Sequence, residues 1–165
     1  MSTRLRNGIV AGLMAGIPFG VAMQMMSAPT PDGGAIPMMI MVAMVVRSQS
    51  VVIGWTYHLF NSAVIGAIFA GLLGRRAQTY AGSLVWGSLY GIAWWVLGGL
   101  VLMPLLLGMP AFAPLAMADM RSVAIGSLVG HVMYGLILGL AYVWLEARQA
   151  APAHSHGPDS PAHSH

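Results

Sequence analysis

Apolar residues fill four long segments of the chain almost without interruption, and polar residues gather between them. The segments are 8–27, 51–74, 80–107 and 122–145. Each is long enough to cross a hydrocarbon core of about 30 Å at about 1.5 Å per residue of helix. The pattern therefore predicts four membrane-spanning helices.

Two further segments differ from these helices. The apolar stretch 35–46 is too short to cross a bilayer, and Pro37 suits the start of a helix, so a short helix lying in or dipping into the interface is expected. After Glu146 the composition changes to Ala, Pro, His and Ser, and the apolar periodicity stops. These features predict a transmembrane domain over 1–148 and a disordered, His-rich cytoplasmic tail over 149–165.

Composition supports a membrane protein, because 58% of the residues are hydrophobic, 7% are charged and the mean hydropathy is +0.76. The chain has no cysteine, which excludes disulfide frameworks, thiolate nucleophiles and CxxC metal sites. The net charge of +3 comes from arginines scattered at the ends of apolar segments, with no basic patch. The expected partner is therefore the lipid bilayer and not nucleic acid.

The arginines near the helix ends are divided unevenly between the two sides of the membrane. Arginine collects on the cytoplasmic side of membrane proteins. The larger group is Arg4, Arg6, Arg75, Arg76 and Arg148, and the smaller group is Arg47 and Arg121. This imbalance predicts a multi-pass protein of the cytoplasmic (inner) membrane with both termini in the cytoplasm.

The two halves of the chain carry similar landmarks in the same order and at a nearly constant offset. Gly12, Gly16, His58, Ser62 and Gly66 correspond to Gly87, Gly91, His131, Gly135 and Gly139. Because both halves start on the same side, they would be related by an axis along the membrane normal. The expected fold is all-α, an integral membrane four-helix bundle with a pseudo-twofold repeat of two helical hairpins plus the short interfacial helix.

Glycines at a spacing of four residues line one side of the first helix, and a similar pair lies on the third. Small residues at this spacing let a second backbone approach closely. The expected packing residues are Gly8, Gly12, Gly16, Gly20, Gly87 and Gly91. The same groove would also suit a homo-oligomer or an accessory subunit that packs beside a larger membrane complex.

Several helix-borne motifs resemble those of a known family. They are Gly54-Trp55 followed by His58, Gly91-Ile92-Ala93-Trp94-Trp95, Val101-Leu102-Met103-Pro104, and Gly130-His131 followed by Tyr134-Gly135 and Gly139. Over about residues 5–145 the chain resembles a group of small four-helix membrane proteins of bacteria and archaea catalogued as a domain of unknown function. The resemblance implies the fold and brings no activity with it.

Two histidines, His58 and His131, occupy matching positions in the second and fourth helices, on faces that also carry Asn61 and Tyr134. Both lie roughly 10–14 Å from the outer end of their helices at the helical rise per residue. They could share a metal ion, a haem iron or a quinone, or each could make a separate interhelical hydrogen bond. Haem is disfavoured because one helix pair shows little sign of groups that would bind its propionates.

Methionine and tail histidines supply further candidate ligands. Most of the 14 methionines lie near the predicted outer face, and Met38 and Met41 could add thioether ligands for Cu(I) to the histidine pair, or simply fill space. In the tail, paired imidazoles could bind Cu, Zn or Ni weakly, or remain solvated. These tail residues are His154, His156, His163 and His165.

Enzymatic chemistry is not expected. The carboxylates Asp32, Asp119, Glu146 and Asp159 all lie outside the predicted spans, and no nucleophile, phosphate-binding or metalloprotease motif occurs, so no catalytic residue is assigned. The sequence favours a non-enzymatic membrane protein that handles a soft metal ion, copper above all, or a small ligand at an outer-leaflet histidine pair. The alternatives are a structural or accessory subunit and a haem- or quinone-binding redox subunit.

Overall fold

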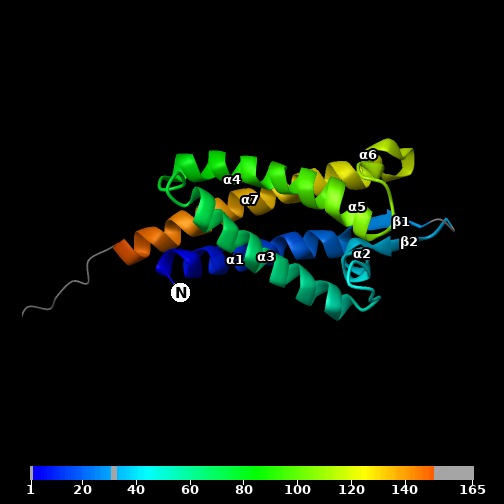
Figure 1. The fold of residues 1–165 in the computed structure, drawn as a ribbon, viewed down its shortest axis with the longest axis horizontal. Coiled ribbons are helices and arrows are strands. Elements are labelled where there is room, and N and C mark those ends of the chain that lie inside the picture. Colours follow the sequence, from blue (N-terminus) through cyan, green and yellow to red (C-terminus); the bar gives the residue numbers. More distant parts are fainter. Residues whose placement is uncertain (1, 31–32, 151–165) are drawn as a thin grey trace, which may run out of the picture.

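The protein is a bundle of long helices, as seen in a computed structural model that describes residues 2–30 and 33–150. Four helical segments in these ranges are long and apolar enough to cross a membrane. They are Thr3–Met25, Val51–Leu73, Tyr80–Leu106 and Ala118–Ala150. The structure thus confirms an all-α four-helix bundle of a multi-pass membrane protein (Figure 1).

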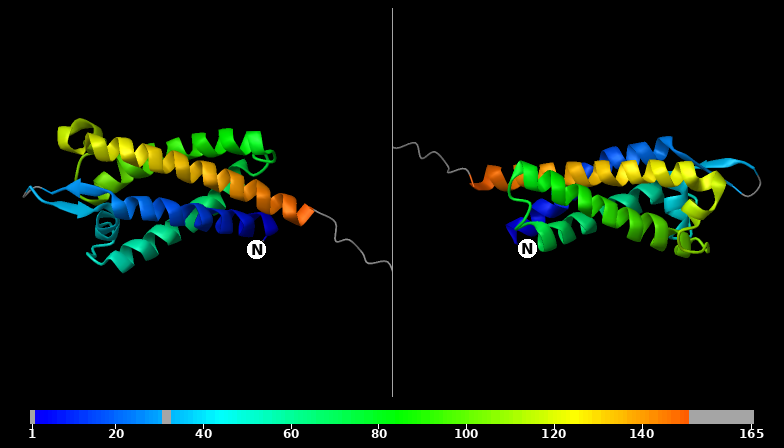
Figure 2. Two further views of the ribbon diagram at one scale, coloured as in Figure 1. Left: turned by 180° about the vertical axis from the view of Figure 1, so that it is seen from behind. Right: turned by 90° about the horizontal axis from the view of Figure 1, so that it is seen from above.

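The helices pack as two hairpins. Helix α1 (Thr3–Met25) packs against α3 (Val51–Leu73), and α4 (Tyr80–Trp94) packs against α7 (Arg121–Ala150). Contact between α1 and α7 joins the hairpins. The start of α1, the α3–α4 connection and the end of α7 lie at one end of the bundle, called here the inner end (Figure 1, left). The two short strands and α6 lie at the opposite, outer end, as the two further views in Figure 2 also show.

Capping and a polar cluster set the inner ends of the helices. The side chain of Ser2 accepts a hydrogen bond from the Leu5 N–H, so α1 begins before the apolar segment does. Buried Asn7 donates to the side chains of Glu146 and Gln149, and Gln149 donates back to Asn7. These bonds hold the last turns of α7, which runs beyond the predicted end of the fourth apolar segment and into the first two residues of the predicted tail.

The outer connection of the first hairpin contains two strands and a helix shorter than expected. Strand β1 (Ser27–Pro29) pairs antiparallel with β2 (Ala35–Pro37), and α2 (Met38–Met44) follows. A proline disfavours helical geometry in the residue that precedes it. Ile36 precedes Pro37, and it is extended and joins the strand pair. The interfacial helix expected over 35–46 therefore begins only at Met38.

The third span changes its helical geometry halfway along. Helix α4 continues into the π-helix η1 (Trp95–Leu102) and then into α5 (Met103–Leu106). The outer connection then forms α6 (Ala113–Ala116) and the 3₁₀ turn η2 (Ala118–Met120) before α7. A π-helix is wider than an α-helix because its hydrogen bonds span five residues, and this rare geometry is frequent at functional sites.

Backbone-to-backbone contacts hold each hairpin together. A Cβ atom at Gly12 would strike the Ser62 carbonyl oxygen of α3, and one at Gly87 would strike the Gly135 carbonyl oxygen of α7. These are equivalent positions in the proposed repeat. The other glycines expected to pack also lie in tight contacts: Gly8 with Gly66, Gly16 with Ser62, Gly20 with the Trp55 ring and Gly91 with His131.

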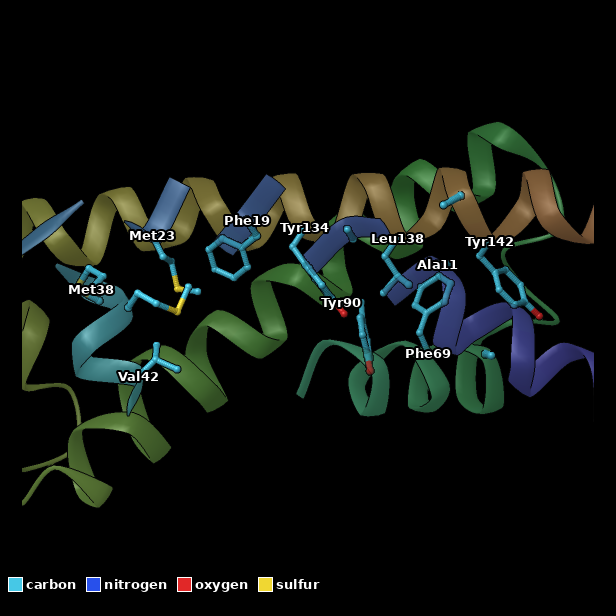
Figure 3. Packing of buried hydrophobic residues seen from close by; sticks show 14 of the residues in the cluster. Ala11, Phe19, Met23, Met38, Val42, Phe69, Tyr90, Tyr134, Leu138 and Tyr142 are labelled. Atoms are coloured by element: carbon cyan, nitrogen blue, oxygen red, sulfur yellow. The ribbon is translucent and has the colours of Figure 1, made fainter. Parts of the chain in front are cut away.

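An aromatic cluster fills the space between the hairpins toward the inner end (Figure 3). The Phe69 ring meets Tyr90 and Tyr142 edge to face, with ring centroids 5.2 and 5.7 Å away. The Tyr90 hydroxyl donates to the Ile65 carbonyl at 2.7 Å and so ties α4 to α3. This cluster closes the inner half of the bundle.

Gly12→Ala is expected to lower the free energy of unfolding by about 1–3 kcal/mol, because the new methyl group must push two backbones apart. The matched control is Gly71→Ala, on the exposed face of α3, where a Cβ meets nothing within 4 Å. Thermal unfolding in mild detergent measures both. Equal stability of the two variants would show that the Gly12 contact does not hold the hairpin.

Candidate ligand cavity

A cavity of about 290 Å³ lies between the two hairpins, outward of the aromatic cluster. Helices α1, α2 and α3 contribute one part of its lining, and η1, α5 and α7 contribute much of the rest. Most lining side chains are apolar, with a few polar groups among them. Sites that bind small organic molecules have mostly apolar linings and volumes from about 300 Å³ upward. The volume and the lining of this cavity match such sites.

The cavity opens sideways, between α3 and the η1–α5 segment. Val64, Leu102 and Leu106 line it and are also 41%, 42% and 59% exposed. Val64 and Leu102 lie within segments long and apolar enough to span a membrane, and Leu106 is the last residue of the third span. A molecule dissolved in the bilayer could therefore reach the interior without crossing the aqueous phase.

Methionine-rich segments cover the outer end of the cavity. Met38, Met41 and Val42 of α2 line it from one hairpin, and Met109 and Met120 from the other connection. Figure 3 shows Met38 and Val42 on α2 near Met23 of α1. The two methionines expected as metal ligands are thus both at the cavity.

His58 is bonded across its own hairpin. Its Nε2 lies 2.8 Å from the Gly16 carbonyl oxygen of α1, and only 7% of the residue is exposed. A carbonyl can only accept, so Nε2 carries the hydrogen and donates. The neutral ring, which a hydrocarbon environment strongly favours, then leaves Nδ1 as an acceptor.

His131 is bonded within its own helix. Its Nδ1 donates to the Ser127 carbonyl at 2.8 Å, with the Ser127 hydroxyl 3.3 Å away. The neutral ring therefore keeps Nε2 as an acceptor. Unlike His58, this half-buried imidazole makes no hydrogen bond to another helix among the described residues.

The two histidines meet around one phenylalanine. The Phe19 ring of α1 lies edge to face with both imidazoles, its centroid 5.6 Å from that of His58 and 4.9 Å from that of His131. Gly130 of α7 leaves room for this ring. The structure thus places the predicted histidine pair in one cavity, on either hairpin, with Phe19 in contact with both.

The other two predicted ligand-binding residues also line the cavity, and they differ in their bonding. The Tyr134 hydroxyl donates to the Ser62 carbonyl at 2.9 Å and links α7 to α3, so it is already engaged. The Asn61 carboxamide has no hydrogen-bond partner in residues 2–30 and 33–150. Asn61 is therefore free to bond a ligand, whereas Tyr134 has a structural role.

The π-helix forms a wall of the cavity that sequence patterns did not identify as a site. Trp95, Gly98 and Gly99 of η1 line the cavity beside Trp94, the last residue of α4. The Trp95 indole N–H donates to the Ala124 carbonyl at 3.1 Å. A Cβ at Gly99 would lie 3.4 Å from the Ser127 hydroxyl and 3.6 Å from the His131 ring. The sequence signal that could have indicated this wall is the pair Trp94-Trp95 followed by Gly98-Gly99.

A metal ion in the cavity would need soft ligands. In the part of the chain that the structure describes, no three His, Cys, Asp or Glu side chains come together at a metal-binding distance. Six methionines line the cavity with the two histidines: Met23, Met38, Met41, Met103, Met109 and Met120. The tail candidates His154, His156, His163 and His165 lie outside the described residues.

Comparison of the chain with protein-family models, curated proteins and solved structures finds no match. The resemblance to a four-helix family of unknown function therefore rests on the motif residues alone.

Proposed function

We propose that this protein is a non-enzymatic membrane protein that binds a small, mostly apolar ligand taken up from the bilayer. The observation that carries the proposal is the sideways opening, where Val64, Leu102 and Leu106 belong both to the cavity lining and to the lipid-facing surface. A site for water-soluble ligands would open to the aqueous phase. Here apolar side chains of α2 and the outer connections cover that end.

The few polar groups in the cavity suit orientation of a ligand more than catalysis. The neutral imidazoles and the Asn61 carboxamide can fix a polar end by hydrogen bonds. A carboxylate that could serve as a general base is not among the lining residues. The proposal therefore assigns binding, and not turnover, to this site.

Gly99→Leu is expected to abolish binding, because its side chain would project into the cavity beside Ser127 and His131 without striking backbone. The probe is brominated octylbenzene, whose bromine quenches indole fluorescence at short range, and Trp94 and Trp95 report from the cavity wall. The parent protein should show saturable quenching in detergent, and Gly99→Leu should not.

The matched control is Gly71→Leu, which adds the same side chain to the exposed face of α3, away from the cavity. It should keep the saturable quenching. Absence of saturable quenching in the parent protein, or its persistence in Gly99→Leu, would contradict ligand binding in this cavity.

A second candidate function is binding of Cu(I) at the same place. It is favoured by the six methionines and by the two imidazoles, each of which donates one N–H to a backbone carbonyl and keeps the other nitrogen unprotonated. Metal-ligating histidines usually have this arrangement, and thioethers suit Cu(I).

A double-mutant cycle tests the copper site. If His58 and His131 share one Cu(I), His58→Ala and His131→Ala should each abolish high-affinity binding, and the double variant should lose little more. Titration of Cu(I) against a chromophoric chelator measures this, in a full-length background with the four tail histidines replaced by alanine. Unchanged chelator competition in the parent background would exclude the copper site.

We also propose that both ends of the chain face the cytoplasm. The start of α1 and the end of α7 share the inner end of the bundle with Arg75 and Arg76 of the α3–α4 connection. This arginine-rich end should be cytoplasmic. A reporter that functions only in the cytoplasm should therefore be active when it is fused after His165. Activity of a reporter that functions only in the periplasm would reverse the assignment.

A further inference from the structure

The polar groups that line the cavity differ in which hydrogen-bond donors and acceptors they leave free for a ligand. Three donors that line it are engaged by backbone carbonyls: the hydroxyls of Tyr134 and Ser62 and the indole N–H of Trp95. The two imidazoles also use their N–H groups on carbonyls, of Gly16 and Ser127. Each imidazole is therefore left with an acceptor nitrogen.

His131 is the imidazole better placed to receive a ligand. His58 is nearly fully buried and its ring bonds α1 to α3, whereas the His131 ring bonds only its own helix and is half-buried at the cavity. A Cβ at Gly99 of η1 would lie 3.6 Å from the His131 ring, in ordinary contact, so an added carbon fits beside the ring on that side of the cavity. The Nε2 acceptor can accept from a ligand without breaking any bond between helices.

The surroundings of His131 suit a flat ring. Phe19 already meets the imidazole edge to face, and Trp94, Trp95 and Tyr57 line the same cavity. Aromatic side chains bind ligand rings in this edge-to-face or offset manner. The opening between Val64 on one side and Leu102 and Leu106 on the other leads from this region to lipid.

From these contacts we infer that the cavity takes a phenolic amphiphile, an aromatic ring that bears a hydroxyl and an alkyl chain. The hydroxyl donates to Nε2 of His131, the ring lies among Phe19 and the two tryptophans, and the chain leaves through the opening between α3 and the η1–α5 segment. The inference rests on the proposed function and names the ligand class. At His131 a ring with only carbonyl acceptors would face the lone pair of Nε2, so the Asn61 carboxamide would have to donate to it instead.

A pair of probes isolates the hydroxyl. 4-Octylphenol and 4-octylanisole share the ring and chain, but the ether cannot donate. We expect the phenol to bind about tenfold more tightly than the ether, the factor that one well-made hydrogen bond supplies where water is excluded. Competition of each probe against brominated octylbenzene in detergent gives both affinities.

His131→Phe should reduce the phenol affinity to that of the ether and leave the ether affinity unchanged. His131→Gln keeps an acceptor oxygen and should retain part of the preference for the phenol over the ether. Retention in this variant would show that the loss in His131→Phe does not come from unfolding. The matched control is Thr56→Val on the lipid-facing side of α3, whose hydroxyl bonds only the Val52 carbonyl.

The outcomes separate the two proposals. Binding of neither probe would overturn the proposed function and the phenol inference together. Equal affinity of phenol and ether for the parent protein would overturn the inference alone. A phenol preference that survives in folded His131→Phe would overturn the assignment of His131 as the acceptor.

Discussion

The bundle depends on direct contact between helix backbones at glycine. At Gly12 and Gly87 no side chain separates the paired helices, so dispersion contacts accumulate in a medium that offers no hydrophobic drive for helix association. Farther out, the contacts in the first hairpin pass to side chains, and Gly20 meets the Trp55 ring instead of backbone. The helices are therefore tightest toward the inner end. The cavity lies where side chains have replaced backbone as the spacer.

Hydrogen bonding in lipid explains how the hairpins stay joined around this cavity. A buried hydroxyl or imidazole in lipid has no water to bond, so most such groups here bond a backbone carbonyl of their own helix or of a neighbouring one. Tyr90 and Tyr134 both donate to α3, and His58 donates to α1. These bonds consume donors, and helical carbonyls can accept a second hydrogen bond at little cost. At His131 the group left unbonded is the acceptor Nε2, whereas the Asn61 carboxamide keeps donors as well as an acceptor.

Much of the architecture could be predicted from sequence because hydropathy, glycine spacing and repeated landmarks are local or regularly spaced signals. The four spans and the close contacts at Gly12 and Gly87 followed from them. The π-helix did not, because an apolar run such as Trp95–Leu102 suits α and π geometry equally. The cavity volume depends on side chains from opposite hairpins, which no local pattern records. The depth of the histidines was predictable, but the free nitrogen of each ring was not.

The histidines also show how a repeat can acquire a site. His58 and His131 are equivalent by sequence, and so are Gly16 and Gly91, yet only His58 reaches its glycine carbonyl with its ring. In the second hairpin the backbone of His131 packs against Gly91, and the helix beyond Gly91 widens into η1. The His131 ring therefore bonds its own helix and faces the cavity. In a symmetric bundle both imidazoles would bond a carbonyl of the neighbouring helix. The third span widens beyond Gly91, and in this hairpin the His131 ring is left at the cavity, where the proposed ligand chemistry needs it.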